Sequence, residues 1–179
     1  NKDSAGNIWV STAGGLNKIV RVGSTYNFLP VPFEDTRTNR IKNIQCVFDA
    51  GNGEMIAGTN DGLVIFSKSN VTGAAVKIKR ALPGIPVVSV VKDKHQNFWI
   101  GTRGSGLFKT DHEFRIVEHY TEGSRPVGLL SNIIRKLRID KAGRIWIGTL
   151  KGLNLLYPDS GKIESYTHHP DDARSLNFN

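Results

Sequence analysis

The chain has 179 residues, of which 39% are hydrophobic and 22% are charged, and it carries a formal net charge of +8. These values are ordinary for a folded domain and exclude a disordered or collagen-like chain. No apolar run approaches the roughly 18 residues that a membrane-spanning helix needs, and the single cysteine, Cys46, excludes an internal disulfide framework and a cysteine-based zinc site.

The positive charge is compatible with attraction to nucleic acid, anionic lipid or acidic polysaccharide. The 24 Lys and Arg residues are spread over the whole chain without a run of five. A nucleic-acid-binding surface usually concentrates its cations along one helix or stripe. We therefore expect a basic solvated surface and no nucleic-acid partner.

One sequence pattern occurs four times, at residues 3–16, 49–63, 93–107 and 140–153. Its threonine recurs at spacings of 47, 43 and 47 residues, at Thr12, Thr59, Thr102 and Thr149. A period of roughly 40 to 50 residues with several short strands is typical of a four-stranded propeller blade. The sequence therefore predicts an all-β fold in which residues 1–179 form a β-propeller fragment of about four blades.

Each repeat opens with an aspartate, and the Gly or Asn residues that follow favour a tight turn between two strands. The next five residues alternate bulky and small side chains, which predicts a strand. In three repeats this strand carries a tryptophan, and we expect the three indoles to pack between blades: Trp9, Trp99 and Trp146.

A glycine precedes the threonine in three repeats, at a position where a strand normally carries a side chain. These residues, Gly58, Gly101 and Gly148, predict a close approach of another segment. A Gly-Leu pair then begins the third strand. The segments at 41–49, 85–93 and 132–140 are rich in β-branched residues and lead into the next repeat, so each is predicted to be the innermost strand of a blade.

The first repeat lacks such a segment before its aspartate, so the first blade is predicted to lack its innermost strand. A fragment of this kind cannot close into a ring by itself, and open sheet edges invite pairing. We therefore expect the ring to be completed by further blades of the same protein or by a second copy in a homo-oligomer.

The pattern D-x-x-G-x-[IF]-W-[IV]-G-T-x-x-G-L, most complete at residues 93–107 and 140–153, resembles the two-component regulator propeller repeat. The second repeat departs from it at Met55 and Ile56, and Ser11 replaces the glycine in the first. The resemblance implies the periplasmic, extracytoplasmic sensor region of a membrane-anchored hybrid two-component regulator from carbohydrate-utilising bacteria. It also implies an oligosaccharide ligand, with any histidine kinase activity lying outside this chain and no membrane insertion of this segment.

The sequence offers no converging set of catalytic groups. The five histidines show no metal-ligand spacing beyond the adjacent pair His168 and His169, and the motifs of nucleophilic hydrolases, zinc peptidases and phosphate-binding loops are absent from the sequence. The recurring aspartates resemble the turn of sialidases, but two residues separate Asp from Gly where that motif has one. We therefore predict no enzyme, no metal and no cofactor, and keep two alternatives to the sensor: a structural or protein-interaction propeller that mediates dimerisation, and a glycan hydrolase or lyase.

A ligand of a propeller usually binds where loops from several blades meet at one end of the central channel. Two loop sets are predicted to share that end: the turn between the second and third strands, and the segment that enters the innermost strand. Their charged and amide side chains can bind sugar hydroxyls or an anionic group. The candidate ligand-binding residues, for an oligosaccharide that the net charge suggests is anionic, are Arg40, Asn60, Asp61, Arg103, Arg125 and Lys151.

Overall fold

The computed structural model describes residues 1–33, 41, 43–70, 76–124 and 128–177. Within them, fifteen strands form four antiparallel sheets, three of four strands and one of three, and the helical structure is limited to the 3-10 turn η1 (Lys68–Asn70). The predicted all-β fold is confirmed. The first blade has three strands, because it lacks the innermost one.

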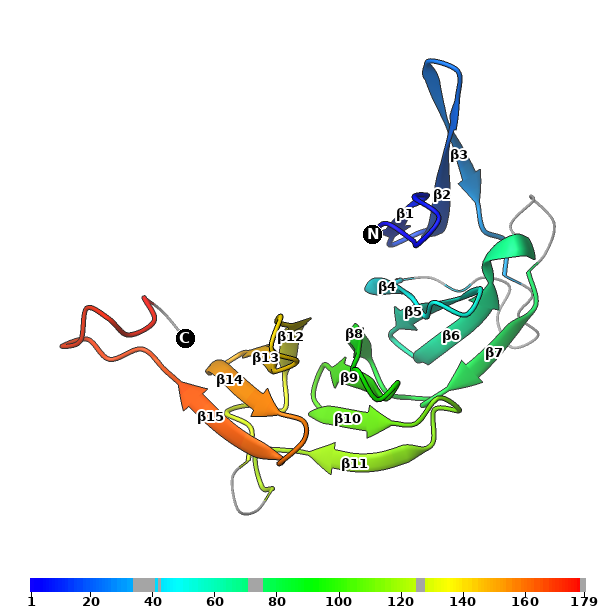
Figure 1. Cartoon of the computed structure of the whole chain (residues 1–179). Coiled ribbons are helices and arrows are strands. Elements are labelled where there is room, and N and C mark those ends of the chain that lie inside the picture. The colour runs from blue at the N-terminus through cyan, green and yellow to red at the C-terminus, as the bar shows by residue number, and fades with distance from the viewer. Residues whose placement is uncertain (34–40, 42, 71–75, 125–127, 178–179) are drawn as a thin grey trace. The chain divides into compact units, whose positions relative to one another are not determined.

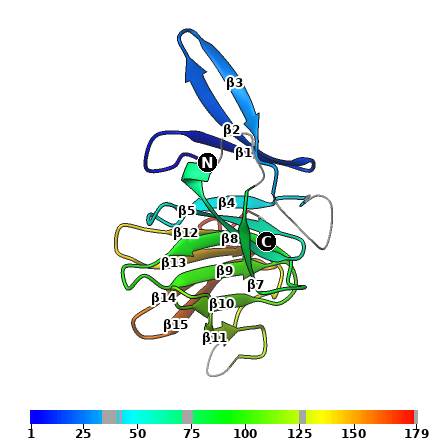
Figure 2. The ribbon, with the colours of Figure 1, turned by 90° about the vertical axis from the view of Figure 1, so that its right-hand side faces the viewer.

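The chain divides into two compact units, Asn1–Val87 and Val88–Asn179. Unit 1 holds blade I, with strands β1 (Ile8–Thr12), β2 (Gly15–Val22) and β3 (Thr25–Pro30), and blade II, with β4 (Cys46–Asp49), β5 (Glu54–Thr59), β6 (Gly62–Ser67) and β7 (Ile78–Ala81). In Figures 1 and 2, β2 and β3 form a long hairpin that extends beyond β1.

Unit 2 holds blades III and IV, and the boundary between the units falls at the start of β8. Blade III consists of β8 (Val87–Lys92), β9 (Phe98–Thr102), β10 (Leu107–Thr110) and β11 (Ile116–Tyr120). Blade IV consists of β12 (Ile134–Ile139), β13 (Ile145–Thr149), β14 (Gly152–Tyr157) and β15 (Lys162–Tyr166). Both sheets are simple meanders, so β8 and β12 are edge strands.

The repeat aspartate organises the turn before the second strand of a blade. In blade III, Asp93 Oδ1 accepts hydrogen bonds from the backbone N–H groups of His95 and Asn97, both at 2.9 Å, and Oδ2 accepts one from the indole Nε1 of Trp99 at 2.8 Å. The same indole bond recurs in blades I and IV, at 2.9 Å for Asp3 and 3.1 Å for Asp140. The aspartate is therefore a turn residue, as predicted, and it also fixes the tryptophan.

Hydrogen bonding to the aspartate of the first repeat, Asp3, favours its charged form. Burial by itself raises the pKa of Asp3, but the bonds from the Trp9 indole and from Asn7 and Ala5 together lower it. The carboxylate is thus an acceptor in the folded chain at neutral pH.

Blade II lacks the tryptophan, and its aspartate has a different partner. Asp49 Oδ1 lies 2.7 Å from Lys68 Nζ, and Oδ2 accepts a hydrogen bond of 2.6 Å from the backbone N–H of Ser4 in blade I. Burial raises the pKa of Asp49, but the Lys68 ammonium and the bonds from Ser4 and Gly51 outweigh it and hold the pKa well below its usual range. The repeat residue here joins two blades.

The repeat threonine closes the turn between the second and third strands. Its Oγ1 donates to the carbonyl of the glycine at the start of the third strand, or just before it in blade III, at 2.7 to 3.1 Å. The same Oγ1 accepts a hydrogen bond from a backbone N–H within the turn. That glycine has a positive φ in every repeat, and a Cβ at Gly106 would lie 2.2 Å from the carbonyl oxygen of Tyr120. Both constraints require glycine at this position.

Blades I and II pack on each other through Trp9, which is 1% exposed and meets the ring of Phe66 edge-on at 5.8 Å between centroids. Blades III and IV pack through Trp99, which is fully buried in one cluster with Ile134, Leu137 and Ile145. These contacts bury the second-strand tryptophan of one blade against the following blade.

The glycine before the threonine permits the close packing of neighbouring blades. A Cβ at Gly101 of blade III would lie 2.8 Å from Ile134 Cγ2 of blade IV, and within blade II a Cβ at Gly58 would lie 2.6 Å from Cys46 Sγ. The predicted close approach is present at both. At Gly148 the nearest atom to such a Cβ is the carbonyl oxygen of Lys136 at 3.7 Å, so this position of blade IV is open.

Candidate functional site

The two loop sets named as the ligand-binding end meet within each unit. In unit 1, Asp61 in the turn between β5 and β6 accepts a hydrogen bond from the backbone N–H of Gly84 at 2.8 Å, and its Oδ2 lies 3.5 Å from Arg80 Nη1. The backbone N–H of Gly62 donates to the carbonyl of Ile85 at 3.0 Å. The turn of blade II is thus fastened to the segment that enters β8.

The corresponding loops of unit 2 converge on residues 131–133. Arg103, in the turn after β9, forms a β-bridge with Ile133, and the backbone N–H of Leu150 donates to the carbonyl of Ile133 at 3.0 Å. The neighbouring Lys151 pairs with Glu122 at 2.7 Å. The structure therefore places Arg103 and Lys151 on either side of one segment.

The candidate ligand-binding residues differ in whether their side chains are exposed and whether a neighbouring residue already binds them. The exposed Asn60 lies at the tip of its turn. Asp61 and Lys151 are also exposed, but each is engaged by a neighbour within its own unit. Arg40 and Arg125 lie outside the described residues.

A hollow of about 530 Å³ opens beside the turn that follows β1 in unit 1. It is lined by uncharged residues, mostly small or apolar: Thr12, Gly14, Gly15, Leu16, Asn17, Pro30, Val31, Pro32, Phe33 and Ile41. Among the described residues, the wall of this hollow therefore offers no charged group that would select an anionic ligand.

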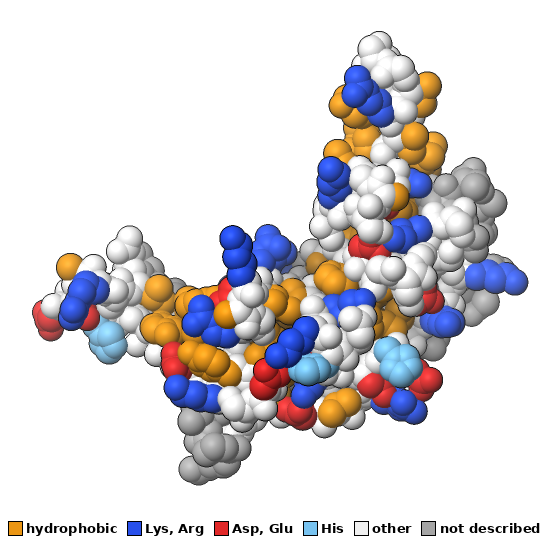
Figure 3. Space-filling model, in the orientation of Figure 1, with side chains coloured by type: hydrophobic (Ala, Val, Ile, Leu, Met, Phe, Trp, Pro, Cys, Tyr) orange, Lys and Arg blue, Asp and Glu red, His pale blue; other side chains and the backbone are white. Residues whose placement is uncertain are grey.

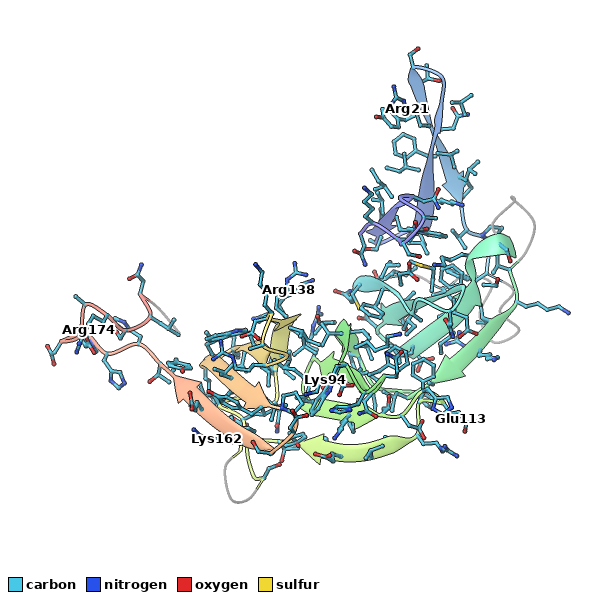
Figure 4. All side chains as sticks on the ribbon, in the orientation of Figure 1. Arg21, Lys94, Glu113, Arg138, Lys162 and Arg174 are labelled. Carbon is cyan, nitrogen blue, oxygen red and sulfur yellow. The ribbon has the colours of Figure 1, made fainter. Side chains whose placement is uncertain are left out.

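Sequence reasoning missed a set of cations on the edge strand of blade IV. Arg135, Lys136 and Arg138 of β12 are all exposed, and Figure 4 shows Arg138 standing away from the sheet. In Figure 3, Lys and Arg side chains gather above this strand. The segment was assigned to a strand for its β-branched residues, whereas the signal for a charged site was the run of three cations within four residues, RKLR.

Across the part of the chain that the structure describes, no three His, Cys, Asp or Glu side chains gather as a metal ion would require. No helix within those same residues has the length and hydrophobicity needed to cross a bilayer.

Comparison with known proteins gives a family match and a distant relative. Residues 128–151 match the family described as two component regulator propeller. Histidine kinase P4 of Formosa agariphila is 35% identical over 66 residues, which are 36% of this chain and 5% of the kinase.

Solved structures share the fold. The extracellular domain of BT3049 from B. thetaiotaomicron, described as a hybrid two component system, matches 98% of this chain and 23% of its own with a TM-score of 0.76 and 20% identity. Virginiamycin B lyase from Staphylococcus aureus matches 98% of this chain and 56% of its own with a TM-score of 0.67 and 13% identity. At such identities the likeness shows the fold alone, and that fold occurs in a lyase as well as in a signalling protein.

The chain spans 5% of the kinase and 23% of the extracellular domain. The family match falls on blade IV, from the segment that enters β12 to the turn after β13. The other three copies of the same sequence pattern form the corresponding turns and strands of blades I to III. One of the four repeats thus matches the two component regulator propeller family, and the chain has the fold of a β-propeller fragment.

Proposed function

We propose that this propeller fragment senses a ligand as part of the extracytoplasmic region of a hybrid two-component signalling protein, and that the ligand is an oligosaccharide. The observation that carries the proposal is the match of residues 128–151 to the two component regulator propeller family. It is supported by the extracellular domain of BT3049, which has the same fold over 98% of this chain. In this proposal the fragment binds the ligand, and any catalytic activity belongs to other parts of the protein.

The proposed binding end is formed by the turns after the second strands and by the segments that enter the innermost strands. Hydrogen bonds fasten these loops to each other, for instance from Gly104 and Gly106 to the carbonyl of Asn132 at 3.1 and 3.0 Å. Loops held on strand ends in this way are pre-organised, which reduces the entropy lost when a ligand binds. In unit 2, Arg103 and Lys151 would offer cationic groups to sugar hydroxyls or acidic substituents, and in unit 1 Asn60 would offer an amide.

Titration calorimetry with a panel of neutral and acidic oligosaccharides tests the proposal. We expect saturable heat with one sugar class, and at least about a threefold weaker affinity after Arg103→Ala, since a charge-assisted hydrogen bond at an exposed site is worth roughly 1 kcal/mol. Lys141→Ala, which removes an exposed cation in the turn between β12 and β13, at the opposite end of these strands from the loops, is the matched control and should leave the affinity unchanged. Absence of heat with every sugar would contradict the sensor.

A second function, a propeller that mediates dimerisation, is favoured by one observation in blade I. Ile8, Val10 and Phe28 are 43%, 36% and 64% exposed. Exposed apolar side chains grouped on one sheet commonly mark a protein contact. In this alternative the blade face binds a second copy or a further blade, and the oligosaccharide panel gives no response.

A further inference from the structure

The turn between the first two strands of blade II differs from the equivalent turns of the other blades. In those blades the repeat threonine lies nine positions after the repeat aspartate, whereas Thr59 lies ten positions after Asp49. The longer turn contains Asn52 and Gly53, the one Asn-Gly pair in the sequence. Both residues are exposed and lie between β4 and β5. The pair is therefore accessible to water and outside the hydrogen-bonded strands.

The backbone N–H of Gly53 is not held by the repeat aspartate. In the other blades, the residue four positions after the aspartate donates its N–H to Oδ1 at 2.8 to 3.0 Å: Asn7, Asn97 and Arg144. Gly53 has the same position after Asp49, but that Oδ1 binds the N–H of Gly51 at 2.9 Å and Lys68 Nζ at 2.7 Å. Among the described residues, the N–H of Gly53 makes no hydrogen bond. No such bond has to break before this nitrogen reacts.

The side-chain amide of Asn52 is held by the residue that follows Gly53. Its Oδ1 accepts a hydrogen bond from the backbone N–H of Glu54 at 3.2 Å, and its Nδ2 donates to Glu54 Oε2 at 3.0 Å. A donor to a carbonyl oxygen makes the carbonyl carbon, here Cγ, a better electrophile, because it stabilises the negative charge that develops on the oxygen during attack. Gly53 has no side chain, and a Cβ built there would meet no atom within 4 Å, so the space around the reacting atoms is open.

We infer that Asn52 is a site of spontaneous covalent modification, at which the chain converts this asparagine to aspartate and isoaspartate. The backbone nitrogen of Gly53 loses its proton to hydroxide and attacks Cγ of Asn52. A bond between that nitrogen and Cγ forms, the bond from Cγ to Nδ2 breaks, and Nδ2 takes up a proton and leaves as ammonia. Water then opens the five-membered succinimide ring at either carbonyl. The attack is intramolecular, so the entropy of bringing the reactants together is already paid.

A second pair in the same blade shows how the fold selects the reactive one. Asp61 and Gly62 can form the same ring with loss of water. However, Gly62 is buried, its N–H donates to the carbonyl of Ile85 at 3.0 Å, and a Cβ there would lie 2.4 Å from the carbonyl oxygen of Leu82. The fold therefore protects this pair and leaves the Asn-Gly pair exposed.

The products change a turn that joins blades I and II. The carbonyl of Gly53 accepts a hydrogen bond from the backbone N–H of Lys68 at 2.9 Å. The ammonium of the same lysine binds Asp49 at 2.7 Å and the hydroxyl of Ser4 in blade I at 3.1 Å. Isoaspartate adds a methylene to the main chain and a carboxylate to the turn, so both contacts of Lys68 are altered. This turn lies at the opposite end of β5 from the proposed ligand-binding loops, which keeps the inference separate from the sensing function.

The test follows the chain during incubation in mildly acidic and mildly alkaline buffer, both folded and unfolded in guanidinium chloride, with an unincubated sample as the baseline. Mass spectrometry of the tryptic peptide 43–68 reports on both pairs and on Asn60 at once. Fragment ions locate a gain of about one dalton, and enzymatic methylation of isoaspartate identifies that product. Asn52→Gln is the test variant, because its longer side chain forms the ring far more slowly, and Asn60→Gln in the next turn is the matched control.

In the folded chain we expect Asn52 to react at least about tenfold faster than Asn60, with isoaspartate among its products and a rate that rises with pH. Asp61 should form isoaspartate only in the unfolded chain. The mass gain should disappear in Asn52→Gln and persist in Asn60→Gln. A folded chain in which Asn52 reacts at least about tenfold more slowly than in guanidinium chloride would overturn the inference, because the fold would then protect this turn. Aspartate as the sole product would also overturn it, since direct hydrolysis by water forms no ring.

Discussion

At the scale of single residues, the repeat is held together by an acceptor that serves several donors at once. Asp93 is 7% exposed and accepts from two backbone N–H groups and from the Trp99 indole, which is itself fully buried. Removal of a buried acceptor leaves its donors without partners, which costs more than the bond itself contributes. The same constellation in blade IV is more exposed, because Trp146 is only partly buried.

We expect Asp93→Ala to lower the free energy of unfolding by about 3 kcal/mol, since the buried indole N–H of Trp99 loses its acceptor. The matched variant Asp140→Ala should cost about 1 kcal/mol, because water can reach the indole of Trp146. Chemical denaturation followed by far-ultraviolet circular dichroism measures both. Equal losses would show that the turn, and not the buried indole, determines the contribution of this aspartate.

At the scale of elements, period and composition were enough to predict the blades. The four copies of one pattern, with a threonine every 43 to 47 residues, locate the strands, the turns and the missing first strand of blade I. The hydrogen bond between Asp93 and Trp99 was not predicted from the sequence. The role of aspartate in starting a turn already explained why this residue recurs, so no second partner was sought. The pairing of Asp49 with Lys68 was also missed, since it depends on the path of the chain after β6.

The candidate site was less predictable, for a physical reason. Loop position could be read from the sequence, but a charged loop residue is available to a ligand only when its own neighbours leave it unpaired. The structure pairs Lys151 with Glu122 and Asp61 with Arg80, and neither partner is adjacent in sequence. Only the coordinates show that both side chains are already engaged.

The contact between neighbouring blades gives a prediction of its own. Gly101→Ala places a methyl group 2.8 Å from Ile134 Cγ2 and should lower the free energy of unfolding by about 1–3 kcal/mol, because the packed side chains must shift. Gly148→Ala is the matched control at the same repeat position, where the nearest atom is 3.7 Å away, and it should change stability by less than about 0.5 kcal/mol. Thermal unfolding of the two variants measures the difference, and a larger loss for Gly148→Ala would contradict the packing described for blade III.

At the scale of the whole molecule, the blades differ in how well they are covered. Ile145 and Ile147 of blade IV are fully buried, whereas Ile8 and Val10, at the same repeat positions in blade I, are 43% and 36% exposed. Five of the six residues of β3 are exposed, but every residue of β9 is buried. Local opening follows such differences, because fewer buried contacts must be broken.

Hydrogen exchange should therefore separate the strands of this chain. We expect the amides of β3 and of the exposed end of β2 to exchange at least about a hundredfold faster than those of β5 and β9, as measured on peptides by mass spectrometry. The control is the same measurement over a range of protein concentrations. Protection of β3 equal to that of β9 at every concentration would contradict the prediction, whereas protection that grows with concentration would show that a second copy covers Ile8, Val10 and Phe28, as the dimerising alternative requires.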